Sequence, residues 1–436
     1  MKPILLSMTL ASMGAAVAAA QPPHFTLTDL GAVGGAPGQA YSIAHNGLMG
    51  GAATAADGTS HATLWYKGAK ADISEPGLGG RNSLVFSVNE RGLAVGGAES
   101  TITTNPISPN ATGADFCGFK AMGLPTKPGA ACVAFAWQYG MMTELPNLGG
   151  SNSEANGVNN RGVIAGVAES SKTDPDCPAP QVLQFSPVIW DREGIHELPR
   201  AAGDPDGVAL AVNDVGQVAG GSGACSSFNF QLLFNLQPLH ALLWDTGTVT
   251  ELGNLGGPGK AFGGHIALAL NNNGQVVGSS DLPDDQSSHA FLWTKETGMQ
   301  DLGTLPGDSL SAGIAINDAG TVVGVSLDSD FNLRGFYWQN GTMSDLNDLI
   351  PANSNLAILL PCSINPRGEI VGLAVDKSTG EGHAFLLTPS AGTPADNGSA
   401  ANDTPVSEDT HRARPALTDD VRRLLMRLAG RYAAIR

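Results

Sequence analysis

The chain has 436 residues, of which 42% are hydrophobic and only 14% are charged, and its formal net charge is −17. This composition provides enough apolar side chains for a large core. The negative charge argues against nucleic acid or an anionic membrane surface as a partner of the protein body, because both would repel it.

Residues 1–20 are expected to be a secretory signal peptide. Lys2 precedes an apolar run over Ile4–Leu10, and the alanines at 18–20 predict cleavage before Gln21. We therefore expect a secreted or periplasmic protein. No later run reaches the roughly 20 apolar residues that a membrane-spanning helix requires, so no transmembrane segment is expected.

Residues 21–389 form a repeat of short apolar runs separated by turns. The runs are too short for helices and are typical of strands. In each Asn-x-x-Gly turn the first residue is expected to cap the turn and the glycine to adopt a positive φ. The turn glycines are Gly47, Gly92, Gly162, Gly216, Gly274, Gly320 and Gly368.

The phase of the repeat predicts a closed ring. A strand of the type His-Ala-Phe-Leu-Trp begins at His61, Val133, Ser186, His240, His289, Arg334 and His383. A strand that ends in an acid and an apolar residue begins at Thr28, Ala71, Thr143, His196, Thr250, Gln300 and Ser344. The first member of the second set precedes the first turn, and no member follows the strand at His383. The N-terminal strand is therefore expected to complete the last sheet.

The sequence therefore predicts an all-β fold, a seven-bladed β-propeller of four-stranded blades closed by an N-terminal strand. In this arrangement Phe25–Leu30 pairs beside His383–Leu387. An open solenoid is the alternative, but it would need atypical caps at its two ends rather than two complementary half-repeats.

These motifs carry a family resemblance. The run His-Ala-Phe-Leu-Trp at 289–293, Asp-Leu-Gly-x-Leu at 301–305 and the turn from Asn317 to Gly320 before Val-Val-Gly resemble the HAF-repeat family of bacterial extracellular repeat proteins. The resemblance covers roughly Thr28–Thr388 and is weaker where other residues replace the turn Asn or the leading His. The replacements are Ala44, Val133, Ser186 and Arg334. Membership implies export and a propeller-like body, but no catalytic residues.

Three long insertions predict a functional face. They lie between the second and third strands of consecutive blades, at Ser100–Cys132, Ser170–Gln184 and Gly221–Leu239. In a propeller such loops share one face with the crossings between blades, so this face is the candidate functional surface. Insertion without a role is the alternative, because long surface loops cost little closure entropy.

The third insertion and nearby acids supply the candidate binding residues. Phe228, Phe230 and Phe234 alternate along an expected extra strand, whose apolar face either packs on the blade or meets a partner. The candidate acids are Asp204, Asp206, Asp281, Asp284 and Asp285, and further pairs stand at Asp174 and Asp176 and at Asp328 and Asp330. Solvated turn acids are the default interpretation and no cofactor is expected; a structural calcium ion is the alternative.

Five cysteines fit an exported protein. We expect Cys117–Cys132 to close a local loop and Cys177–Cys225 to tie adjacent blades, although sequence alone does not fix connectivity. Cys362 is left unpaired in a first strand and is interpreted as a small core residue, not a nucleophile.

The repeated histidines and tryptophans are interpreted as structural, because they recur at equivalent places in several blades. The histidines, His61, His240, His289 and His383, are expected to hydrogen bond a neighbouring turn, and the tryptophans to fill the space between blades. No pattern of a nucleophile elbow, zinc protease or phosphate loop occurs. No catalytic, metal or cofactor-binding residue is therefore assigned.

The end of the chain differs from the repeat. Residues 390–415 have the composition of a disordered linker. Residues 416–436 predict a basic amphipathic helix that contacts the acidic propeller itself, an envelope surface or a partner.

The favoured function is a non-enzymatic binding or interaction module that presents the inserted face to a protein or glycan. The alternative is a propeller-type hydrolase or lyase acting on extracellular polysaccharide, with acids supplied by several blades. A third hypothesis is an architectural envelope component anchored by its C-terminal helix.

Overall fold

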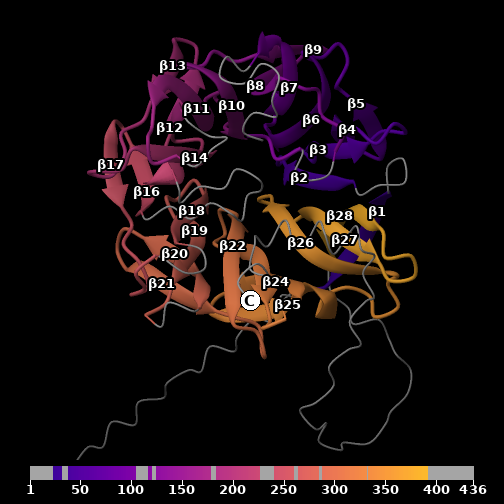
Figure 1. The fold of residues 1–436 in the computed structure, drawn as a ribbon. Coiled ribbons are helices and arrows are strands. Elements are labelled where there is room, and N and C mark those ends of the chain that lie inside the picture. Colours follow the sequence, from indigo (N-terminus) through magenta and orange to yellow (C-terminus); the bar gives the residue numbers. More distant parts are fainter. Residues whose placement is uncertain are drawn as a thin grey trace, which may run out of the picture.

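The fold consists of seven four-stranded antiparallel sheets, seen in a computed structural model of the chain (Figure 1). The structure describes residues 23–31, 38–104, 116–119, 124–177, 183–225, 240–259, 264–283, 287–330 and 332–390. The expected signal peptide lies outside these residues, and so do the expected linker and helix apart from Ser390. Within the described ranges, no helix has the length and apolarity needed to cross a membrane.

Each sheet is one blade, and its strands follow one another from the centre outward in six of the seven blades. Blade 1 contains β2 (Gln39–Ile43), β3 (Met49–Thr54), β4 (Ser60–Tyr66) and β5 (Ala69–Asp72). Blade 2 contains β6 (Gly79–Val88), β7 (Ala94–Thr104), β8 (Ala130–Gln138) and β9 (Met141–Glu144). Blade 3 contains β10 (Gly149–Val158), β11 (Ile164–Thr173), β12 (Leu183–Asp191) and β13 (Gly194–Glu197).

The other blades repeat this order. Blade 4 contains β14 (Asp206–Val212), β15 (Val218–Gly223), β16 (His240–Asp245) and β17 (Thr248–Glu251). Blade 5 contains β18 (His265–Leu270), β19 (Val276–Asp281), β20 (Ser288–Thr294) and β21 (Gly298–Gly303). Blade 6 contains β22 (Leu310–Ile316), β23 (Val322–Leu327), β24 (Leu333–Gln339) and β25 (Thr342–Asp345), followed by the 3₁₀ turn η2 (Leu346–Asp348).

The seventh blade closes the ring with the N-terminal strand. It contains β26 (Leu356–Ile364), β27 (Ile370–Asp376) and β28 (Gly382–Pro389), and β1 (Phe25–Gly31) is its outer strand. Phe25 lies opposite Pro389 and Leu27 opposite Leu387. In Figure 1 the indigo β1 accordingly lies beside the yellow β28. The predicted propeller and its closure are confirmed, and the solenoid alternative is wrong.

The core lies between the blades, because each sheet buries both faces against its neighbours. Trp190 of blade 3, for example, packs in one cluster with Val95 of blade 2, and Trp65 of blade 1 packs with Val371 of blade 7. The indole N–H of Trp190 also donates to the carbonyl of Pro146 in the crossing between blades 2 and 3. The predicted role of the tryptophans as filler between blades is therefore confirmed.

A ring of asparagine side chains joins the turns between first and second strands. The predicted turn geometry is confirmed: Gly320 has a φ of 76°, and Oδ1 of Asn317 accepts the backbone N–H groups of Ala319 and Thr321. The same side chain uses Nδ2 to donate to the carbonyl of Asn365, the equivalent residue of the next blade. Each buried asparagine thus caps its own turn and also bonds the neighbouring turn.

This contact repeats around almost the whole propeller. The donor and acceptor pairs are Asn89 to Asn159, Asn159 to Asn213, Asn213 to Asn271, Asn271 to Asn317, Asn317 to Asn365, and Asn365 to Ala44. Ala44 has no side-chain donor, and there Asn46 donates to the carbonyl of Glu90 instead. The asparagines therefore join neighbouring blades in the way that strand pairing joins strands within a blade.

A tight approach of backbone inside each blade explains a second repeated glycine. In β19, a Cβ added at Gly278 would lie 1.8 Å from the carbonyl oxygen of Ile266 in β18. The pairing of these strands shifts between Ala267 and Ala269, so a bulge brings the first strand onto the glycine. In the other blades, a Cβ added at the equivalent glycine would also lie within 2.1 Å of a first-strand carbonyl oxygen. These glycines are Gly51, Gly96, Gly166, Gly220, Gly324 and Gly372.

Candidate functional site on the inserted face

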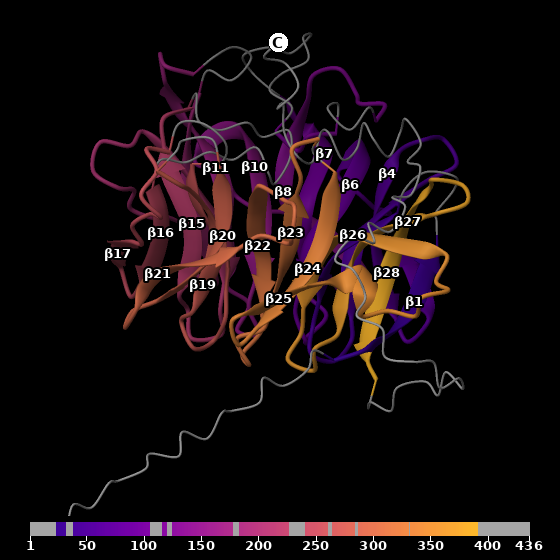
Figure 2. The same ribbon diagram turned by 90° about the horizontal axis from the view of Figure 1, so that it is seen from below.

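The described ends of the first insertion contact a crossing between blades, as predicted, whereas residues 226–239 of the third insertion lie outside the described residues. Figure 2 shows the sheets edge-on. Asn82, in the crossing from blade 1 to blade 2, donates to the carbonyl of Pro125 in the first insertion at 3.0 Å. Thr101 likewise donates its backbone N–H to the carbonyl of Leu78. We call this side of the ring the inserted face.

Two disulfides hold the insertions. Cys117 pairs with Cys132 and Cys177 with Cys225, with Cα atoms 5.6 and 4.9 Å apart, so the predicted pairing is confirmed. The first bond closes a loop within blade 2, and the second joins the insertion of blade 3 to the end of β15 in blade 4. Such bonds persist in oxidising compartments, which is consistent with the predicted export.

The insertions share one apolar cluster with the blades beneath them. Phe116 of the first insertion is fully buried and meets Phe185 of β12 edge to face, with ring centroids 6.4 Å apart. The same cluster includes Phe119, both disulfides' cysteines, Val208 of blade 4 and Ile266 of blade 5. The described part of the inserted face is therefore a packed extension of the core and not a set of separate loops.

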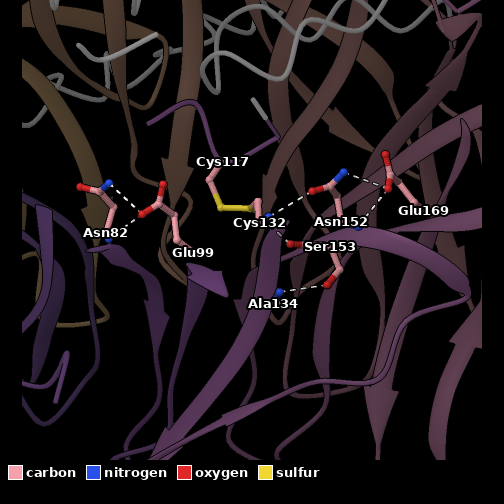
Figure 3. Close-up of a disulfide and its surroundings, with 8 residues drawn as sticks. All are labelled: Asn82, Glu99, Cys117, Cys132, Ala134, Asn152, Ser153 and Glu169. Atoms are coloured by element: carbon pink, nitrogen blue, oxygen red, sulfur yellow. Dashed lines mark hydrogen bonds between the residues drawn. A yellow bond between two sulfur atoms is a disulfide. The ribbon is translucent and has the colours of Figure 1, made fainter. Parts of the chain in front are cut away.

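Buried glutamates anchor the crossings, a role that sequence reasoning missed. Glu99 in β7 accepts hydrogen bonds at Oε2 from the backbone N–H and the side-chain amide of Asn82. Asn82 in turn accepts the backbone N–H of Ser60 in blade 1. Glu169 and Asn152 repeat the arrangement, and Asn152 accepts from Cys132, so the disulfide lies between two such pairs (Figure 3).

These asparagine and glutamate pairs share a sequence pattern. Each pair consists of Gly-Gly-x-Asn in the crossing and a glutamate 17 residues after the asparagine. A Cβ at Gly80 would lie 2.2 Å from the Cβ of Glu99, so the glycine is required for the close approach. These buried carboxylates hold blades together and are not presented to solvent.

The structure places the predicted binding acids in different environments. Oδ2 of Asp204 accepts hydrogen bonds from Nδ1 of His240 at 2.7 Å and from the hydroxyl of Ser222 at 2.5 Å. Asp206 and Asp281 have no exposed surface, so their side chains do not reach a surface partner. Phe228, Phe230, Phe234, Asp284 and Asp285 lie outside the described residues.

The structure brings two acids together. Asp174 in the second insertion and Asp206 at the start of β14 interact through their carboxyl groups. Burial raises the pKa of Asp206 to about 8, the backbone N–H of Phe185 opposes the rise, and the hydrogen bond and charge of Asp174 add to it. The second oxygen of each carboxyl group accepts no hydrogen bond from the residues that the structure describes. This pair lies beside the Cys177–Cys225 disulfide.

The repeated histidines hydrogen bond acids within the propeller. Nδ1 of His289 lies 2.9 Å from the carboxylate of Asp301, the acid of the fourth strand in the same blade. His61 and His383 bond Asp72 and Asp29 in the same way, whereas His240 bonds Asp204 in a crossing. The histidines form hydrogen bonds, as predicted. The predicted partner, a neighbouring turn, is wrong in three of the four blades, where the partner is a fourth-strand acid; only in blade 4 does the partner lie in a crossing.

Substituting His289 with glutamine is expected to lower the free energy of unfolding by less than about 1 kcal/mol at pH 7, because the pair is partly exposed. Burial alone would raise the pKa of Asp301, but the hydrogen bonds from His289 and from the backbone of Gly303 outweigh it and lower the pKa. Because the pKa of Asp301 is lower in the folded than in the unfolded protein, its interactions stabilise the fold at pH values above its unfolded pKa, near about 4. This stabilisation is lost as the pH falls through the folded pKa.

Urea unfolding of the wild type and His289→Gln at several pH values measures this contribution. The difference between the two proteins should persist down to about pH 4 and shrink as the pH falls through the folded pKa of Asp301. A difference that stays constant across the acid range would show that the histidine acts through packing alone.

Cys362 has the properties expected of an unreactive thiol. It lies in β26, is unpaired and receives a hydrogen bond from the side-chain amide of Gln39 at 3.3 Å. Burial raises the pKa of its thiol to about 12. Since the thiolate is the nucleophilic form, this thiol is inert at neutral pH.

Comparisons with known proteins give fold resemblances only. No family model and no curated protein matches the chain. The propeller domain of the Trilobed protease from Pyrococcus furiosus is 10% identical, with a TM-score of 0.44, over 83% of this chain and 95% of that domain. TolB from Acinetobacter baumannii is 14% identical, with a TM-score of 0.38, over 76% of each chain.

The acylaminoacyl peptidase of Pyrococcus horikoshii is 10% identical to this chain, with a TM-score of 0.41. The alignment covers 81% of this chain and 52% of the peptidase. Similarity at this level is no guide to activity, and the propeller assignment stands on the seven sheets and their closure by β1.

Proposed function

We propose that the chain is an exported, non-enzymatic binding module that presents the inserted face to a protein or a glycan. The observation that carries the proposal is the construction of this face. Cys117–Cys132 closes a loop within the first insertion, Cys177–Cys225 joins the second insertion to blade 4, and the described parts of the insertions pack on one apolar cluster. A surface held in this way loses little conformational entropy when it binds a partner.

The burial and hydrogen bonding of the acids support a binding function over a catalytic one. Cleavage of a glycoside requires two carboxyl groups about 5 to 9.5 Å apart on an open groove. Glu99 and Glu169 are buried in hydrogen bonds to the crossings, and Asp204 bonds His240. Asp174 and Asp206, two of the described candidate acids, do meet but are buried against each other.

One observation favours the competing function, a hydrolase or lyase acting on extracellular polysaccharide. The pKa of Asp206 is raised to about 8, first by burial, and a general acid needs such a raised pKa to stay protonated at neutral pH. Because Asp206 has no exposed surface, the inserted face would have to open before a substrate could reach it.

A binding and product assay separates the two functions. The chain from Gln21 onward is incubated with a panel of insoluble extracellular polysaccharides and peptidoglycan. We expect saturable retention on one class of glycan, or on none if the partner is a protein, without new reducing ends or unsaturated sugars. Release of such products would establish the enzymatic function instead.

The role of the inserted face is tested with a shortened variant. Residues 101–130 are replaced by a short glycine-containing turn between the paired Ser100 and Ala131, and Cys132 is changed to serine. We expect this variant to lose retention. Val215→Ser, at an exposed position on the opposite side of the ring, should bind like the wild type. Unchanged retention by the shortened variant would contradict the proposed site.

A further inference from the structure

Two buried carboxylate oxygens on the inserted face need a positive partner. Asp206 has no exposed surface and Asp174 is 7% exposed. Each carboxyl group uses Oδ1 to accept one backbone N–H, from Phe185 for Asp206 and from Asp176 for Asp174, both at 2.8 Å. Among the described residues, none donates to Oδ2 of either carboxyl group. An unpaired carboxylate oxygen is costly to bury, and two adjacent ones repel each other.

In the part of the chain that the structure describes, no nearby cation supplies this partner. Arg200 is close enough for its charge to act on Asp206, but its Nη1 donates to Ser186 and Glu197. The neighbouring sulfur atoms of Cys177 and Cys225 are joined in a disulfide, so they offer no thiolate and no proton. The donor set is therefore composed of oxygen, which hard divalent cations prefer and softer metals do not.

We infer that Asp174 and Asp206 are two ligands of a calcium ion that joins the second insertion to blade 4. Calcium accepts carboxylate and backbone oxygens in a flexible geometry, whereas magnesium dehydrates reluctantly and needs near-octahedral positions, so calcium is the better occupant of a buried site. The ion would act beside the Cys177–Cys225 disulfide and hold the same two segments. This inference does not rest on the proposed binding function.

A shared proton is the competing explanation, because a protonated Asp206 could donate to Asp174. The raised pKa of Asp206, caused mainly by burial and in part by Asp174, indicates that both groups are not ionised together unless another charge compensates. Calcium and a proton would thus compete for one position, and calcium titration separates them.

The experiment is thermal unfolding and isothermal titration calorimetry of the full exported chain after treatment with EDTA. We expect one calcium ion to bind per chain and the unfolding temperature to rise by about 5 °C at a calcium concentration near 100 times its dissociation constant. Asp206→Asn should fold, because its amide N–H can donate to Asp174, but it should lose both the heat of binding and the rise in unfolding temperature.

Asp330→Asn is the matched control, since it removes an exposed aspartate from the corresponding loop of blade 6. It should respond to calcium like the wild type. The inference is overturned if the wild type binds no calcium, or if Asp206→Asn keeps the full calcium response. Either result would leave the shared proton as the explanation of the pair.

Discussion

Substituting Asn271 with alanine is expected to lower the free energy of unfolding by about 3 kcal/mol, because buried backbone groups lose their partners. Its Nδ2 donates to the carbonyl of Asn317 at 2.9 Å and to Oε1 of Gln275 at 2.7 Å. Its Oδ1 accepts the backbone N–H groups of Asn273 and Gln275. Alanine removes the bond to the next blade and the cap of its own turn together.

Urea unfolding of Asn271→Ala measures this loss, and Asn272→Ala is the matched control. Asn272 also bonds the next blade: alanine removes the bond from its Nδ2 to Oδ2 of Asp318 and keeps the bond from its backbone N–H to Oδ1, and the residue is exposed. Water can replace an exposed hydrogen bond, so the control should lose less than about 1 kcal/mol. Equal effects of the two substitutions would show that burial of the asparagine ring does not matter to stability.

Substituting Gly278 with alanine is expected to destabilise the fold by about 3 kcal/mol or more, because the new methyl group overlaps backbone atoms. The added Cβ would lie 1.8 Å from the carbonyl oxygen of Ile266 and 3.0 Å from the ring of Phe291. Neither the bulged strand β18 nor the buried phenylalanine can move without disturbing the contact with blade 4.

Thermal and urea unfolding test this expectation, with Ser279→Ala as the control in the same strand. Ser279 is equally buried, and alanine there removes volume and adds none. The control should change the stability by less than about 1 kcal/mol. If Gly278→Ala unfolds within about 0.5 kcal/mol of the wild type, the first strand tolerates displacement and the bulge is not a fixed feature of the blade.

Asn271 shows how the ring resists opening. Strand pairing stabilises each blade internally, while contacts between blades depend on side-chain packing and on the asparagine ring. The seventh blade adds β1, whose Asp29 bonds His383 from the other end of the repeat. Loss of a contact between blades therefore weakens a closed circle and not a single local element.

The sequence by itself determined the architecture. The phase of the repeats, with an unpaired strand at Thr28 and none after His383, required closure of the ring, because an unpaired edge is unfavourable. Gly320 and its equivalents predicted the turns, since only glycine adopts a positive φ without strain. The cysteine pairing was also predicted correctly, from the position of the cysteines within the insertions.

Only the tertiary structure decided what the polar residues bond. A turn asparagine was predicted to cap its own turn, a contact within four residues, but its second partner lies 46 to 58 residues away for the asparagines of blades 3 to 6. The sequence alone assigns no partner to Glu99 or Glu169 and gives Asp174 and Asp206 only as separate turn acids. Their partners come from different blades, and distances between blades depend on how the sheets pack rather than on local sequence pattern.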